Sequence, residues 1–173
     1  MIGDSRTRYG VISRLFHWGV GALILWQALK LGDRIAEGEH WIGQTLVPWH
    51  VSIGSVLLVL IVLRIFWAIS QLPRRPLHDP ATVWLVKSGH FALYAVMLAM
   101  PLSGLAYLIG NGYGVKVFGN QLVAKGDEIG WAAAVGSLHS PLAWLLVILI
   151  VGHVGMALYH RLVKRDDIMQ RML

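Results

Sequence analysis

The 173-residue sequence contains no cysteine and only nine acidic residues. The absence of cysteine excludes disulfides, iron–sulfur clusters and covalently attached c-type haem. Only 14% of the residues are charged, against about a quarter in soluble domains, whereas 56% are hydrophobic. The scarcity of charge and the abundance of apolar residues indicate a membrane protein.

The apolar residues gather in long blocks, each close to the roughly 20 residues that a helix needs to span about 30 Å of hydrocarbon. There are four such blocks: Val11–Leu31, Val51–Ile69, Phe91–Ile109 and Pro141–Tyr159. An open sheet cannot satisfy its backbone hydrogen bonds in lipid, so these blocks are helices. We therefore predict a single all-α domain over residues 1–173, a bundle of four transmembrane helices. We expect no cleavable signal peptide, because the first block contains Arg14 and His17.

Basic residues are unevenly distributed along the chain. Most lie in the N-terminal tail, in and beside the connection between the second and third blocks, and at the C-terminal end. By the positive-inside rule both ends of the chain are cytoplasmic, in the inner membrane if the source is bacterial. We interpret the basic charge as a topology signal and a contact with anionic lipid. The sequence contains no nucleic-acid-binding motif that would compete with this interpretation.

The last apolar block carries three histidines at multiples of seven. His139 and His153 are fourteen residues apart, and His160 follows seven residues later. A helix advances about 100° and 1.5 Å per residue, so fourteen residues return to nearly the same face roughly 21 Å further along. We expect one stripe of histidines along this helix, with His139 near its outer end and His153 deep on the inner side.

Histidines at matching depths occur on the other predicted helices. His17 lies near the inner end of the first helix, and His50 opens the second helix at its outer end. This pattern predicts an outer pair, His50 with His139, and an inner pair, His17 with His153. Haem iron accepts two axial imidazoles, and bundle cores hold such cofactors. The spacing therefore predicts two haem b groups stacked across the membrane, with these four histidines as iron ligands.

Small residues near the histidines are expected to leave room for a flat cofactor: Gly19, Gly21, Ser52, Gly54, Gly152 and Gly155. Arg64 follows His50 by fourteen residues and therefore lies on the same face at the inner end. It is a candidate partner for haem propionates. Extension of its side chain to lipid phosphate is the alternative, and the sequence does not choose between them.

A transition-metal site or a proton path is another interpretation of these histidines. Both are disfavoured, because the predicted spans contain no Cys, Asp or Glu. His40 and His78 fall in predicted loops, where we expect them to be exposed. For His90 and His160 four roles remain open: a spare inner ligand, a propionate contact, part of a quinone site, or simply a polar residue at the membrane interface.

The chain resembles the bacterial cytochrome b561 family through four stretches: SRLFHW, WHVSIGSVLLVLIVLRIFW, GHFALYAVMLAMPLSG and LHSPLAWLLVILIVGHVGMALYH. These proteins are four-helix, dihaem b-type cytochromes related to the cytochrome b subunits of membrane-bound hydrogenases and formate dehydrogenases. The resemblance implies the same histidine pairs as the depth argument. It also implies quinone chemistry near the cytoplasmic haem, where His160, His90 and Lys87 are the candidates in this sequence.

Three functions follow as expectations. The first is electron transfer across the inner membrane between the quinone pool and a periplasmic donor or acceptor, with superoxide as one candidate. That function would make the chain an oxidoreductase or an electron carrier. The second is a membrane anchor subunit that passes electrons for a periplasmic dehydrogenase or a soluble cytochrome. The third is a haem-free small transporter or proton channel, which would leave the matched histidine depths without a purpose.

Overall fold

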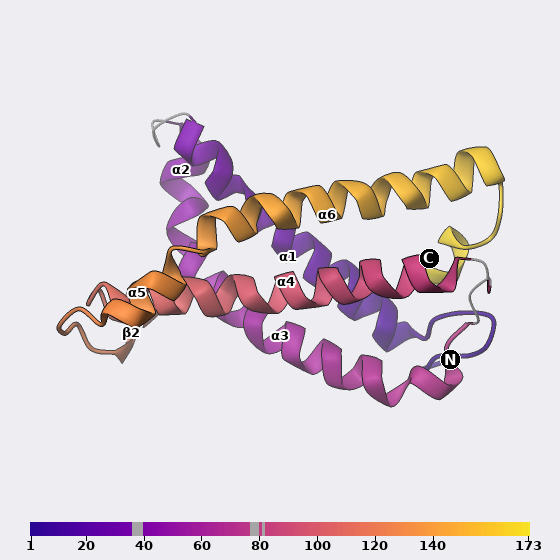
Figure 1. Cartoon of the computed structure of the whole chain (residues 1–173), viewed down its shortest axis with the longest axis horizontal. Coiled ribbons are helices and arrows are strands. Elements are labelled where there is room, and N and C mark those ends of the chain that lie inside the picture. The colour runs from indigo at the N-terminus through magenta and orange to yellow at the C-terminus, as the bar shows by residue number, and fades with distance from the viewer. Residues whose placement is uncertain (36–39, 77–79, 81) are drawn as a thin grey trace.

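The computed structural model describes residues 1–35, 40–76, 80 and 82–173. Four long helices run between the two ends of the molecule (Figure 1): α1 (Val11–Ile35), α3 (His50–Ser70), α4 (Val83–Gly110) and α6 (His139–Tyr159). Helix α1 packs on α3, α3 on α4 and α4 on α6, whereas α6 makes few close backbone contacts with α1 or α3. The predicted all-α fold is confirmed.

Three helical stretches of the described residues are long and apolar enough to cross a membrane: Trp41–Ser70, Val83–Gly110 and Gly130–Lys164. Helix α1 is 25 residues long, but Arg14, Gln27 and Lys30 interrupt its apolar run. It does not meet the same criterion, so the fourth crossing stays a prediction. Large apolar side chains point outward along the bundle, including Phe66 at 68% exposure and Phe91 at 75%, as a lipid-facing surface requires.

Short elements connect the long helices: α2 (Trp41–Thr45), η1 (Val47–Trp49), η2 (Leu72–Arg74), β1 (Val115–Val117), β2 (Asn120–Val123) and α5 (Gly130–Gly136). Two more, the π-turn η3 (His160–Lys164) and η4 (Met169–Met172), follow α6. The antiparallel β1–β2 hairpin lies in the connection between α4 and α6, where the all-α prediction included no strand. Its two central residues, Phe118 and Gly119, have φ values of 46° and 87°. Positive φ at both positions is the geometry of a type I′ hairpin turn.

The connection between α4 and α6 folds back onto the end of the bundle where His50 and His139 lie, called the outer end after the predicted topology. The Phe118 backbone N–H donates to the Ser52 hydroxyl at 2.9 Å, and its ring lies 6.0 Å from that of Trp49. Helix α5 lies against α4 so closely that a Cβ at Gly110 would approach backbone to 2.2 Å, and one at Gly136 to 2.4 Å. Only glycine permits this approach, so the connection forms a fixed cover over the end where His50 and His139 lie.

Both chain termini, the last turn of α3 and the first turn of α4 lie at the opposite end (Figure 1), called the inner end after the predicted topology. Asp4 is only 4% exposed there, and its carboxylate accepts hydrogen bonds from the Ser13 hydroxyl at 2.6 Å and the Gly10 N–H at 2.9 Å. Arg75 lies 3.5 Å from the same carboxylate. The basic connection therefore neutralises a buried acid, in addition to its predicted role in topology.

Candidate functional site

The outer histidine pair lies where two helices begin. His50 is the first residue of α3 and His139 the first of α6, and their ring centroids are 6.0 Å apart with the planes at 87°. His139 Nδ1 lies 2.9 Å from the Met100 carbonyl oxygen of α4. We assign the proton to Nδ1 from this contact, which leaves Nε2 free to bind a metal.

Three histidines meet at the inner end. The ring centroids of His17 on α1 and His153 on α6 are 6.0 Å apart, with the planes at 53°. His90 of α4 approaches His153 as well, at 5.7 Å and 83°. The rings of His17 and His153, which the sequence predicts to lie at the same depth, are thus close together in the structure. The structure also places His90, whose role the sequence left open, beside this pair.

Arg64 points into the inner site. Its guanidinium Nη2 lies 3.3 Å from His17 Nδ1, and its Nε donates to the Tyr94 hydroxyl at 3.2 Å. A third nitrogen, Nη1, lies 3.5 Å from the Phe16 carbonyl oxygen. The side chain is therefore turned toward the histidines, where it supplies a fixed positive charge.

The separation within each pair fits axial ligation of one iron atom. Metal–nitrogen bonds of about 2 Å to two imidazoles place the ring centres roughly 6 Å apart. Both pairs have this spacing, 6.0 Å. Among the residues that the structure describes, no group of three or more His, Cys, Asp or Glu could hold a metal ion. The donor set therefore suits a haem, whose porphyrin supplies the remaining ligands, better than a bare ion.

The apolar core separates the two pairs. Leu146 of α6 is buried seven residues from both His139 and His153, and it packs in a cluster with residues of α1, α3 and α4. That cluster contains Val20, Ile24, Leu57, Ile61, Val96, Met97 and Leu146. An apolar layer thus separates two polar sites at different depths.

The five glycines near the histidines fall into two groups. A Cβ added at Gly19, Gly21, Gly152 or Gly155 would meet no atom within 4 Å, so space beside these glycines is open. Gly54 instead makes room for Gln27, whose amide would lie 2.9 Å from such a Cβ and donates to the His50 carbonyl oxygen at 2.9 Å. Gly54 therefore permits the contact between α1 and α3, and the Gln27 side chain fills the space beside it.

The predicted quinone residues lie at the inner end on two helices. Lys87 and His90 are exposed on α4, and His90 Nδ1 lies 2.7 Å from the Val86 carbonyl oxygen of its own helix. His160 Nδ1 donates to Asp166 at 2.6 Å. This hydrogen bond holds the pKa of the Asp166 carboxyl below its usual range. Asp166 was not predicted as a site residue, because it lies six residues past His160 and beyond the apolar block.

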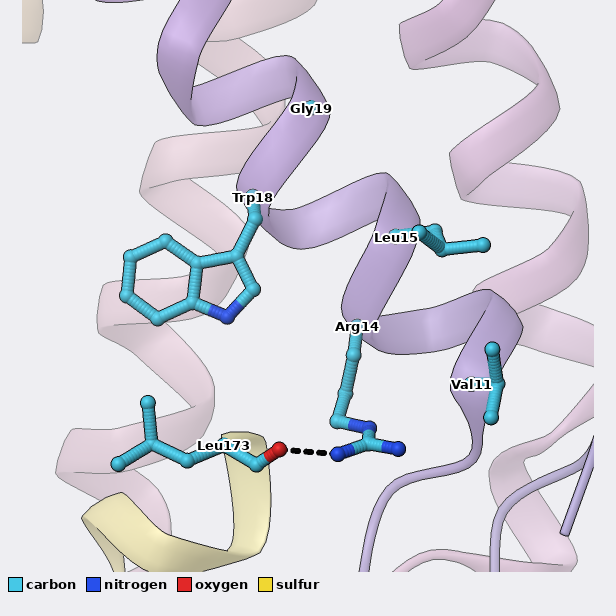
Figure 2. Close-up of a pocket in the computed structure, with 6 residues that line it drawn as sticks. All are labelled: Val11, Arg14, Leu15, Trp18, Gly19 and Leu173. Carbon is cyan, nitrogen blue, oxygen red and sulfur yellow. Dashed lines mark hydrogen bonds between the residues drawn. The ribbon is translucent and has the colours of Figure 1, made fainter.

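Two cavities follow α1 and are lined by other residues. One of about 340 Å³ lies at the inner end beside Arg14, Trp18 and Leu173, where the Arg14 guanidinium donates to the Leu173 carbonyl oxygen (Figure 2). The other, of about 540 Å³, is apolar and runs from Ile12 to Leu23, with Leu60 of α3 on its far side. Gly19, one of the residues expected to leave room for a cofactor, lines both cavities, but neither is lined by a predicted iron ligand, by Arg64 or by a predicted quinone residue.

His40 and His78 were both expected to be exposed in loops, and the structure describes only His40. His40 is half-buried, and its Nδ1 accepts the Gly43 N–H at 3.1 Å as the N-cap of α2. The expectation that it is exposed is wrong, because a ring nitrogen that satisfies a helix N-terminus must lie against that helix. His78 lies outside the described residues.

Paired imidazoles at two depths of an apolar helical bundle without cysteine are the arrangement expected of a membrane-bound b-type cytochrome. The chain belongs to the prokaryotic cytochrome b561 family, whose sequence model matches residues 8–173. It is 35% identical to cytochrome b561 homolog 2 of Escherichia coli K12 over 172 residues, which cover 96% of this chain and 91% of the relative. It is 27% identical to the probable superoxide oxidase CybB of Yersinia pestis over 175 residues, 96% of each chain. The resemblance found in the sequence is confirmed, and membership of this family implies haem b.

Proposed function

We propose that this protein is a dihaem cytochrome that carries electrons across the bacterial inner membrane between quinone and a periplasmic donor or acceptor. The observation that supports this function is the presence of two imidazole pairs on opposite sides of the apolar core. The ring centroids within each pair are 6.0 Å apart. His17 and His153 would hold the inner haem, and His50 and His139 the outer one. Haem b supplies a one-electron iron couple when bound.

Arg64 would serve the inner haem. A guanidinium only donates hydrogen bonds, so in its contact with Arg64 the His17 Nδ1 accepts. An iron-bound imidazole instead keeps its proton on Nδ1. Ligation by His17 would therefore release Arg64, and a haem propionate is the anion that we propose it then pairs with. Its bond to the Tyr94 hydroxyl keeps the guanidinium at this depth.

The partners follow from the two ends of the bundle. Both termini and the basic connection would face the cytoplasm, and quinone would react there. The outer cover would face the periplasm, where the relative from Yersinia pestis, a probable superoxide oxidase, makes superoxide one candidate donor. A periplasmic redox protein is the other candidate, in which case the chain would act as a membrane anchor subunit. Exposed Lys116 on β1 would attract an anionic donor.

Replacing His160 by glutamine tests the quinone end. We expect both haems to remain, because His160 belongs to neither iron pair, while quinone reduction slows by about 100-fold or more, a usual effect of losing a positioned proton donor. The measurement is stopped-flow reoxidation of the chemically reduced protein by a short-chain ubiquinone, followed in the haem α-band. Since Asp166 orients the His160 ring, Asp166→Asn should slow the same step.

His40→Gln is the matched control, since it changes a half-buried histidine beside α2, at the opposite end of the bundle (Figure 1). It should reoxidise at the wild-type rate. Wild-type protein that carries haem but is not reoxidised by any quinone would contradict the quinone half of the proposal. Loss of a haem in His160→Gln would make His160 an iron ligand instead.

A further inference from the structure

The segment Met100–Gly104 of α4 contacts the outer histidine ring and has no role in the function proposed above. His139 Nδ1 lies 2.9 Å from the Met100 carbonyl oxygen and 3.2 Å from the Ser103 hydroxyl oxygen. The Ser103 hydroxyl donates to the same carbonyl at 2.8 Å. The three polar atoms form a closed triangle, and Ser103 is only 3% exposed.

This triangle determines which nitrogen of His139 carries the proton. A carbonyl oxygen has two lone pairs and only accepts, so it can take one proton from Ser103 and one from the ring. Because the Ser103 proton is directed to the carbonyl, the lone pairs of its own oxygen face the ring N–H. Both neighbours of Nδ1 therefore favour a protonated Nδ1, and Nε2 is left as the metal-binding nitrogen.

Gly104 provides the space that the ring occupies. A Cβ at this position would lie 3.0 Å from His139 Cε1 and 3.2 Å from Nδ1. Even alanine would push the edge of the ring away from the triangle by a few tenths of an ångström. Met100, Ser103 and Gly104 thus act on one ring from one turn of α4.

The contacts of Ser103 differ from those of a serine that bonds only within its own helix. Serine in membrane helices commonly donates to a carbonyl three or four residues earlier, and Ser55 of α3 does so with Val51 at 2.9 Å. Ser103 makes the same kind of bond and also faces a histidine of another helix. This second contact distinguishes a role at the outer site from a role within the helix alone.

We propose that Ser103 is a positioning residue for the outer haem. Its hydroxyl, with the Met100 carbonyl, holds the proton and the plane of the His139 ring, and Gly104 leaves room for that ring. The inference rests on the proposed function, since it concerns His139 as an iron ligand. Loss of such supporting partners typically weakens metal binding by about 10- to 100-fold.

The test compares Ser103→Ala, Ser103→Thr, Gly104→Ala and the control Ser55→Ala in the full chain in detergent. Two readouts are used, the EPR spectrum of the oxidised haems and the rate at which each haem transfers to an apoprotein acceptor. The largest g-value of a low-spin bis-imidazole haem depends on the angle between its ring planes, which is 87° for the outer pair and 53° for the inner one. The two haems should therefore give separate signals.

We expect Ser103→Ala to shift the outer signal alone and to release the outer haem at least about 10-fold faster. Threonine should restore both properties because it keeps the hydroxyl, and Ser55→Ala should match wild type. Gly104→Ala should shift the same signal with the hydroxyl intact, which keeps the test valid if Ser103→Ala does not fold.

Two results would overturn the inference while leaving the proposed function intact. One is an outer signal and release rate in Ser103→Ala that equal those of wild type. The other is an equal effect on both haems, which would indicate general loosening of the bundle. A wild-type chain without an outer haem would overturn the proposed function, and this inference with it.

Discussion

Replacing His153 by alanine is expected to remove the inner haem and leave the outer haem in place. His153 is the only histidine of α6 at the inner site, and its ring faces both His17 at 6.0 Å and His90 at 5.7 Å. Whichever of these supplies the second ligand, the iron loses six-coordination without His153. The b-type absorbance per chain should fall to about half, and one of the two low-spin EPR signals should disappear.

The matched variants His17→Ala and His90→Ala identify the partner of His153. We expect His17→Ala to reproduce the loss of the inner haem and His90→Ala to retain both haems. If His90→Ala removes a haem while His17→Ala does not, the inner pairing is wrong. Such a result would agree with the bond of His90 Nδ1 to the Val86 carbonyl, which orients that ring as Met100 orients His139.

Replacing His139 by alanine should have the complementary effect on the outer haem. His139 lies opposite His50, and no other histidine ring approaches this pair within the described part of the chain. The outer haem should therefore be lost from His139→Ala and equally from His50→Ala. Redox titration of either variant should show a single one-electron transition where wild type shows two.

His40→Ala is the control for the outer pair. It removes an imidazole whose Nδ1 accepts the Gly43 N–H at 3.1 Å as the cap of α2 and which belongs to neither histidine pair. It should keep both transitions. Loss of the inner transition from His139→Ala would contradict the assignment of the histidines to two depths. Retention of both haems in His139→Ala would exclude this residue as an iron ligand.

Helix positions were predictable because apolar length is a strong signal. The third span was predicted from Phe91, whereas α4 begins at Val83. Trp84, Lys87 and Ser88 belong to the helix but are not apolar enough as a group to extend the hydrocarbon-spanning block. The hairpin was missed because strands of three and four residues carry no periodicity. The two central turn residues are also Phe118 and Gly119, whereas Asn-Gly is the pair that usually marks such a turn in a sequence.

The histidine pairs were predictable because a helix converts spacing into face and depth. Contacts made by side chains across helices carry no such signal. His90 immediately precedes the predicted block, which starts at Phe91, but it lies about two turns inside α4 and reaches His153. Ser103 reads as an ordinary helix serine, and Asp166 follows Arg165, whose φ of 54° turns the chain back toward His160. These partners depend on how the helices pack, which the sequence pattern does not specify.

Haem stoichiometry tests the central claim most directly. The full chain is purified in mild detergent from cells supplied with haem, and b haem extracted into pyridine is quantified per chain from the reduced-minus-oxidised spectrum. Two haems per chain are predicted, one for each histidine pair with ring centroids 6.0 Å apart. One haem per chain would leave one pair without a function, and none would contradict the account and favour the haem-free transporter.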